Sequence, residues 1–243
     1  MTGEFTSKRC LVLGGSGALG KVVCRRLREA GASVAFTWNS TEVGIEDCVA
    51  LKADLRDVKA TRRVVDEAGE QLGGLEVLVH CAAIWVTDED RDNSLHEKIE
   101  EVDEHGWNHV MEVNVRSAFF ACQQALPLLR VAGGNIVLTG SIDSVKPVPS
   151  PAHYAASKGA LDGMVKSMSK ELGPDKVCAN VVAPGLMEAG LSRMLPAKLK
   201  EDYNQFCALK RPAQLPEIAS VIAWLALENT YVTGQTWLVD GAL

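Results

Sequence analysis

The sequence lacks any apolar stretch long enough to cross a membrane. None of its apolar runs reaches the roughly 18 residues that span a bilayer, and its first ten residues do not follow the layout of a secretory signal peptide. Basic blocks are also missing, since 25 lysines and arginines stand against 31 acidic residues for a net charge of -6. These absences argue against membrane and nucleic-acid partners, and we expect a cytoplasmic protein.

The cysteines form neither a disulfide framework nor a metal site. There are seven of them, scattered along the chain and without a CxxC pair, which is typical of neither disulfide-rich domains nor zinc sites. Several lie within apolar runs, as buried thiols do. We therefore predict no metal ligands and no catalytic cysteine.

Short apolar runs alternate with longer helical patterns along the whole sequence. The expected strands cover residues 10–13, 33–38, 50–53, 77–80, 135–139, 178–182 and 236–239, and the expected helices cover 17–30, 58–72, 106–129, 152–172 and 216–227. Continuously apolar strands separated by helices indicate a parallel sheet that is covered on both faces. We predict a single α/β domain over residues 1–243, a Rossmann fold with a doubly wound, seven-stranded parallel sheet flanked by helices.

A glycine-rich turn joins the first expected strand to the first expected helix. Gly15, Gly17 and Gly20 form a G-x-G-x-x-G pattern in the strand–turn–helix context that dinucleotide binding requires. The N–H groups at the start of the helix attract phosphate. This predicts that the turn binds a dinucleotide, with the contacts made by residues Gly14, Ser16, Gly17, Ala18 and Leu19.

The residues after the second strand bear on the choice between NAD(H) and NADP(H). A carboxylate there holds the ribose 2′-hydroxyl of NAD, but the strand is followed by Asn39, Ser40 and Thr41, and the first carboxylate is Glu42. Asn39 and Ser40 can accept a 2′-phosphate without repelling it, although no Arg or Lys lies beside them to pair with it. We favour NADP(H) over NAD(H).

Four polar residues point to proton transfer at a carbonyl or alcohol. Ser141 ends an apolar strand, Tyr154 and Lys158 share one helix face, and Asn114 lies inside a helix that it disfavours. A phenol with its ordinary pKa of about 10 is a poor base near neutrality, and a neighbouring ammonium lowers that pKa. Ser141 is expected to hold the substrate oxygen, and Asn114 a water that links Lys158 to solvent.

These motifs resemble those of the short-chain dehydrogenase/reductase family, over essentially the whole chain. The resemblance identifies Asn114, Ser141, Tyr154 and Lys158 with the family's catalytic tetrad. It implies cofactor contacts after the third, fourth and sixth strands, made by residues Asp54, Leu55, Ala82, Tyr154, Lys158, Pro184 and Gly185. The layout is most similar to 3-oxoacyl carrier-protein reductases. The segment 232–241 resembles the family's C-terminal strand, which implies a homotetramer or homodimer.

The sequence departs from the family pattern at several points. The glycine turn has Ala18 in place of a glycine, and the Asn-Asn-Ala-Gly motif reads His80-Cys81-Ala82-Ala83, a loss of polar side chains that is expected to loosen the sheet or the turn. Ala189 replaces the threonine that contacts the nicotinamide carboxamide.

Two segments bear on the substrate. Residues 186–209 are expected to cover the pocket with an apolar lining. The acidic stretch 84–106 either shapes the entrance or is a surface insertion, which we favour. Carrier-protein reductases often dock their acidic partner through arginines at positions that here are Ala132 and Asp175, so a carrier-bound substrate is one possibility beside a free, polyketide-like or cyclic ketone.

The sequence supports three functions. The first is reduction of a ketone by NADPH to a secondary alcohol, with Tyr154 as the proton donor. The second is NAD-dependent oxidation of a secondary alcohol, with Tyr154 as the base. The third is a non-catalytic nucleotide-sensing scaffold, which the altered turn favours and the intact Ser141, Tyr154 and Lys158 oppose.

Overall fold

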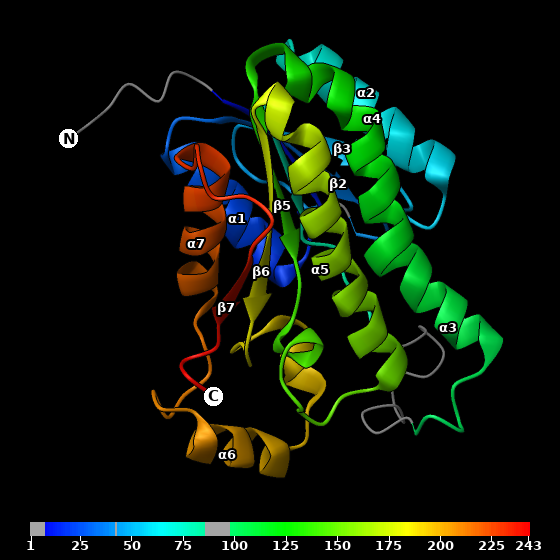
Figure 1. Cartoon of the computed structure of the whole chain (residues 1–243), viewed down its shortest axis with the longest axis vertical. Helices are drawn as coiled ribbons and strands as arrows, with labels where there is room; N and C mark the ends of the chain where they lie inside the picture. The colour runs from blue at the N-terminus through cyan, green and yellow to red at the C-terminus, as the bar shows by residue number, and fades with distance from the viewer. Residues whose placement is uncertain (1–7, 42, 86–97) are drawn as a thin grey trace.

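The computed structural model describes residues 8–41, 43–85 and 98–243, and its centre is a seven-stranded sheet (Figure 1). All strand pairs are parallel and the order is β3-β2-β1-β4-β5-β6-β7. The strands are β1 (Arg9–Leu13), β2 (Ser33–Trp38), β3 (Cys48–Lys52), β4 (Val77–His80), β5 (Gly134–Thr139), β6 (Val177–Pro184) and β7 (Thr236–Val239). The doubly wound α/β fold predicted from the sequence is confirmed.

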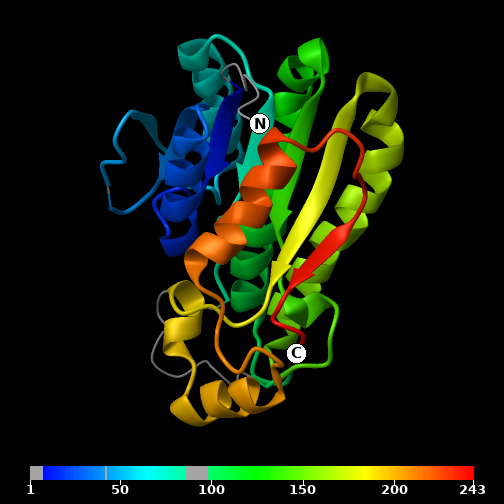
Figure 2. The ribbon, with the colours of Figure 1, turned by 90° about the vertical axis from the view of Figure 1, so that its left-hand side faces the viewer.

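Helices cover both faces of the sheet, as the two views in Figures 1 and 2 show. One face carries α1 (Ala18–Glu29) and α7 (Leu215–Leu227), and the other carries α2 (Val58–Leu72), α4 (Ser117–Ala132) and α5 (Ala152–Leu172). Two further helices are α3 (Glu104–Met111) and α6 (Ala197–Phe206). Within the described residues, no helix combines the length and apolar character needed to span a bilayer.

Alternation along the strands divides the interior into two cores. In β1, Leu11 and Leu13 pack towards α2, α4 and α5, whereas Cys10 and Val12 pack towards α1 and α7. Successive side chains of a strand point to opposite faces, so a strand that is covered on both sides has to be apolar at every position. This is why the strands appear in the sequence as unbroken apolar runs.

The strand order reverses between β1 and β4, which lie side by side although two strands separate them in the sequence. In open parallel sheets a crevice forms at such a switch point, beyond the carboxyl ends of the strands. In Figure 1 these ends point towards α6. The fold therefore directs the residues that follow β1, β4, β5 and β6 into one region.

The helix predicted over residues 106–129 is interrupted in the structure. A π-helical turn, Glu112–Arg116, separates α3 from α4 and contains Asn114. The helix α6 was not predicted, because none of its residues is buried and it therefore has no strong apolar periodicity. The prediction about the acidic stretch 84–106 falls largely on residues 86–97, which lie outside the described residues.

Side chains other than the asparagines of the Asn-Asn-Ala-Gly motif make polar contacts at the end of β4. His80 Nε2 lies 2.7 Å from Ser117 Oγ on α4, and Thr139 Oγ1 of β5 donates to Cys81 Sγ at 3.6 Å. Burial lowers the pKa of His80 to about 3, so the imidazole is neutral. His80 and Cys81 thus link the end of β4 to α4 and β5, and the effect of the replaced motif on the strength of the sheet stays a prediction.

Candidate active site

One cavity of about 980 Å³ lies at the carboxyl ends of the strands, and almost every predicted site residue lines it. All of the predicted cofactor contacts line it, namely Gly14, Ser16, Gly17, Ala18, Leu19, Asn39, Ser40, Asp54, Leu55, Ala82, Tyr154, Lys158, Pro184 and Gly185. Ser141 lines it too, whereas Asn114 does not. The volume is at the upper end of the range for small-molecule and cofactor sites, about 300–1,000 Å³.

The glycine turn is shaped by contacts that leave no room for side chains. Gly14 has a φ of +74°, and a Cβ on it would lie 2.6 Å from the backbone of Ala82. A Cβ on Gly20 would lie 2.2 Å from the carbonyl oxygen of Gly14. Gly14 N donates to Thr37 Oγ1 at 2.8 Å, which fixes the turn against β2.

The start of α1 is open to an anion. Its N-cap is Gly17, and among the described residues no side chain caps it. The first N–H groups of a helix have no partner within the helix and carry partial positive charge. Because Gly17, Ala18 and Leu19 line the cavity, the residues present fit a dinucleotide whose pyrophosphate lies over this turn.

Two cations lie near Asn39 and Ser40, although the sequence showed none beside residues 39–41: Arg56 lines the cavity, and Lys52 packs on Trp38, which also lines it. The Arg56 guanidinium binds the Asp54 carboxylate, with Nη2 to Oδ2 at 2.6 Å, and this hydrogen bond holds the pKa of Asp54 below its usual range. Lys52 Nζ lies 5.1 Å from the centre of the Trp38 ring, because Lys52 and Trp38 pair in register on β3 and β2. Pairing between strands, which the sequence does not show, brings Lys52 there.

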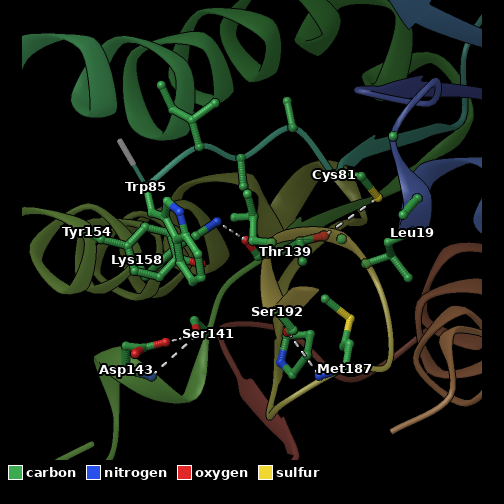
Figure 3. Close-up of a pocket in the computed structure, with 18 of the residues that line it drawn as sticks. Leu19, Cys81, Trp85, Thr139, Ser141, Asp143, Tyr154, Lys158, Met187 and Ser192 are labelled. Carbon is green, nitrogen blue, oxygen red and sulfur yellow. Dashed lines mark hydrogen bonds between the residues drawn. The ribbon is translucent and has the colours of Figure 1, made fainter. Parts of the chain in front are cut away.

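Tyr154 and Lys158 occupy successive turns of α5 and both face the cavity (Figure 3). Lys158 Nζ lies 5.6 Å from the centre of the Tyr154 ring and donates to the Thr139 carbonyl oxygen at 2.9 Å. The Trp85 ring meets the Tyr154 ring edge to face at 6.2 Å. The phenol is thus held between an indole and an ammonium.

Burial dominates the proton affinities of this pair. It raises the pKa of Tyr154, the Asp143 carboxylate raises it further, and a hydrogen bond with Ser141 lowers it. Burial lowers the pKa of Lys158 to about 8, against the attraction of Asp143. The net pKa of Tyr154 thus lies above its ordinary value, because desolvation of the phenolate outweighs the groups that favour it.

Asp143 is a carboxylate in the cavity that the sequence analysis did not select. Ser141 Oγ donates to its Oδ2, and the backbone N–H of Asp143 points back at Ser141 Oγ at 3.5 Å. A short 3-10 turn after β5, Ile142–Ser144, produces this pairing because Ser141 is its N-cap. The catalytic serine candidate is thus bonded to an acidic neighbour (Figure 3).

The Asn114 carboxamide is engaged with protein atoms rather than with the cavity. Its Oδ1 accepts from Ile84 N at 2.9 Å, and its Nδ2 donates to Ile84 O at 2.8 Å and to Ser157 Oγ at 3.0 Å. Ser157 Oγ in turn donates to the Tyr154 carbonyl oxygen at 2.7 Å. The side chain therefore ties the segment after β4 to α5, and a water that links Lys158 to solvent stays a prediction.

Comparison with known proteins agrees with this arrangement. A family model described as enoyl-(acyl carrier protein) reductase matches residues 15–243. The chain belongs to the short-chain dehydrogenase/reductase family. Members are oxidoreductases that use NAD(P) and act on CH–OH and C=O groups, and this assignment makes the chain an enzyme of that class.

Among the relatives of this short-chain dehydrogenase/reductase is a Staphylococcus aureus 3-oxoacyl-[acyl-carrier-protein] reductase, 30% identical over 98% of both chains. An Escherichia coli cyclic-di-GMP-binding biofilm dispersal mediator protein is 32% identical over 99% of this chain and 98% of its own. A Burkholderia cenocepacia short-chain dehydrogenase in complex with NADP is 28% identical over 97% of both chains, with a TM-score of 0.85.

The outer wall of the enzyme's cavity is built by the segment after β6. Its lining residues include Leu186, Met187, Leu191, Ser192, Leu195, Leu199, Asp202, Tyr203 and Phe206. Tyr203 Oη donates to the Asp240 carbonyl oxygen at 3.0 Å, and Lys146 Nζ lies 2.5 Å from Asp240 Oδ2. The first contact ties α6, and the second the segment after β5, to the chain that follows β7. Ser192, whose Oγ accepts from Met187 N at 3.2 Å, supplies a hydroxyl close to the position where the family threonine is Ala189.

Proposed function

We propose that the enzyme uses NADPH to reduce a ketone to a secondary alcohol, with Tyr154 as the proton donor. The observation that carries the proposal is that Ser141, Tyr154 and Lys158 line the same cavity as the glycine turn. A bound nicotinamide supplies the hydride for this chemistry. The protein has to hold the carbonyl oxygen, provide a proton and keep the developing charge from water.

Tyr154 is suited to donate that proton. Burial raises the pKa of its phenol, so the phenol is protonated at neutral pH and ready to act as an acid. Once the proton has left, the Lys158 ammonium stabilises the phenolate by charge. Asn114 acts as a positioning residue, because its bonds to Ile84 and Ser157 hold both sides of the tyrosine.

The charges near the adenosine end support NADP(H) as the preferred cofactor. Asn39 and Ser40 line the cavity and offer no carboxylate to repel a 2′-phosphate, and Lys52 lies beside Trp38, the residue before Asn39. The NADP complex of the Burkholderia relative supports the same choice. We expect Lys52→Ala to raise the KM for NADPH several-fold and to leave the KM for NADH unchanged; equal effects on both cofactors would contradict this assignment.

A free ketone fits the surface charges better than a carrier-bound acyl group. At the positions where carrier-protein reductases present arginines this chain has Ala132 and Asp175, and Arg130 Nε, nearby, lies 2.7 Å from Asp175 Oδ2. An arginine that is paired with a carboxylate attracts an acidic carrier less strongly. Segment 186–209 covers such a substrate with its apolar side chains.

We also propose a homodimer or homotetramer in the cytoplasm. Phe119 on α4 is 47% exposed, and it lines a shallow groove with Met111, Phe120 and Met164. A large exposed aromatic on such a face favours pairing with a second copy. All seven cysteines, which lie within the described residues, are free, as is usual in a reducing compartment.

The experiment that tests the function follows NADPH consumption with a small panel of carbonyl compounds. The panel holds a free aryl ketone, a 3-oxoacyl thioester in free and carrier-bound form, and an enoyl thioester. We expect ketone turnover to fall by about 10²–10⁴-fold in Tyr154→Phe and to stay unchanged in Tyr231→Phe, whose ring is 93% exposed.

Other outcomes distinguish the alternatives. Turnover of a secondary alcohol with NAD alone would favour the dehydrogenase direction. No turnover in any arm, together with a biological effect that survives Tyr154→Phe, would favour a nucleotide-binding role like the one that the name of the E. coli relative describes.

A further inference from the structure

The substrate side of the cavity contains an acidic group that the proposed reduction does not use. The Asp143 carboxylate lines the cavity together with Ser141 and Tyr154. Its Oδ2 holds the Ser141 hydroxyl, and the described residues give no hydrogen bond to its Oδ1. An ionised carboxylate accepts hydrogen bonds at both oxygens, so Oδ1 is open to a donor from the substrate.

The position of Asp143 relative to the reacting oxygen follows from its neighbours. Ser141 Oγ donates to Asp143 Oδ2, and both residues line the cavity together with Tyr154 (Figure 3). A hydroxyl has one proton to donate, so Ser141 can hold a carbonyl oxygen beside Tyr154 only when another donor takes its place at the Asp143 carboxylate. A substituent on the carbon next to the carbonyl is close enough to that oxygen to reach the carboxylate.

The charged groups around Asp143 leave its carboxylate available to a hydrogen-bond donor of the substrate. The nearest lysine in the sequence, Lys146, is paired with Asp240 at 2.5 Å. Lys158 attracts Asp143, but its ammonium is 1% exposed and donates to the Thr139 carbonyl oxygen. The other acidic side chain of the cavity's outer wall, Asp202, adds negative charge. The site thus favours a neutral or cationic substituent and repels an anionic one.

We propose that Asp143 is a specificity-determining residue that selects ketones with a hydrogen-bond donor, a hydroxyl or an ammonium, on the carbon adjacent to the carbonyl. The inference rests on the ketone reduction proposed above and names its substrate class. The donor binds Oδ1 of Asp143, which orients the carbonyl oxygen towards Tyr154 and Ser141. The reduced product is a vicinal diol or a vicinal amino alcohol.

A set of ketones of nearly equal shape tests this selection. The three ketones are 2-hydroxy-1-phenylethanone, 2-amino-1-phenylethanone and propiophenone. They differ only in whether the carbon next to the carbonyl carries a hydroxyl, an amine or a methyl group. A carboxylate that accepts from the substrate gives the two donors an advantage of about 10- to 100-fold in kcat/KM over the methyl compound. We expect Asp143→Ala to abolish this advantage, and Asp143→Asn to reduce it more for the amine than for the hydroxyl.

The ratio of the kcat/KM values for the different ketones distinguishes substrate selection by Asp143 from a purely structural role. If Asp143 merely orients Ser141, both variants slow all three ketones by the same factor, and the proposal is overturned. Glu201→Gln on α6 is the control, because it removes the same charge from an exposed residue that does not line the cavity. We expect this variant to keep the wild-type ratio.

Binding without turnover distinguishes this inference from the proposed function. Calorimetry of the wild-type enzyme saturated with NADPH measures the affinity for 1-phenyl-1,2-ethanediol and for 1-phenyl-1-propanol. A preference for the diol that disappears in Asp143→Ala supports the inference, even if no ketone is turned over. An absence of ketone turnover would contradict only the proposed reduction. Equal affinities for the two alcohols overturn the inference even if propiophenone is reduced.

Discussion

Replacing Lys158 by methionine removes the charge beside the phenol while keeping most of the volume of the side chain. The ammonium lies 5.6 Å from the centre of the Tyr154 ring. With that separation and an effective dielectric of about 20, the attraction between ammonium and phenolate is about 3 kcal/mol. This energy corresponds to roughly two pKa units, so we expect kcat for ketone reduction to fall by about 100-fold.

The same substitution is expected to leave the fold intact. Lys158 is 1% exposed, and burial lowers the pKa of its ammonium from 10.5 to about 8. The unfolded chain therefore binds more protons than the folded protein between these values, so the wild-type free energy of unfolding rises with pH in that window. At pH 7 Lys158→Met should be at least as stable as the wild type, and its advantage should shrink as the pH rises from 8 to 10.5.

Two assays check the reasoning together. Steady-state kinetics at saturating NADPH gives kcat, and urea denaturation gives the free energy of unfolding. Lys166→Met is the control, because Lys166 lies exposed on the same helix, α5. A Lys158→Met enzyme with kcat within threefold of wild type would refute the electrostatic role, and a large loss of stability would show that the ammonium is needed for folding instead.

Three further outcomes follow from the geometry of the site. The kcat for ketone reduction should be level below pH 8 and fall above it, because Lys158, with a pKa of about 8, loses its charge; a profile that rises with pH contradicts this. Gly20→Ala places a Cβ 2.2 Å from the Gly14 carbonyl oxygen, so it should destabilise the protein by about 1–3 kcal/mol and abolish NADPH binding measured by fluorescence, unlike Gly163→Ala, which meets no atom within 4 Å. Asn114→Ala leaves Ile84 N–H without its partner and should lower the free energy of unfolding by about 1–3 kcal/mol while kcat falls more than KM changes; normal kcat in a folded variant would remove its positioning role.

The sequence predicted the parts of the site that local chemistry determines. The turn with Gly14 and Gly20 follows a strand and precedes a helix, and the glycines in this context predict the conformation of the turn itself. Tyr154 and Lys158 are one helical turn apart, so their common face follows from the helix period. Ser141 comes directly after a buried strand of a parallel sheet, and this position directs it to the ligand crevice.

Contacts between distant segments were beyond the sequence. Lys52 reaches the end of β2 only through the pairing of β3 with β2. The environment of Asn114 depends on Ile84 and Ser157, which approach it from two other elements. For this reason the sequence pointed to an unusual asparagine in a helix but did not predict these contacts.

The sequence by itself determined the buried strands, the glycine turn between β1 and α1 and the helix face that Tyr154 and Lys158 share, because each depends on neighbours within a few positions. Only the tertiary structure decided the electrostatics of the cavity. Burial, which arises when the whole chain packs, raised the pKa of Tyr154 and lowered that of Lys158. The short turn after β5 set the Asp143 carboxylate beside Ser141, and the folded cavity placed both next to the phenol.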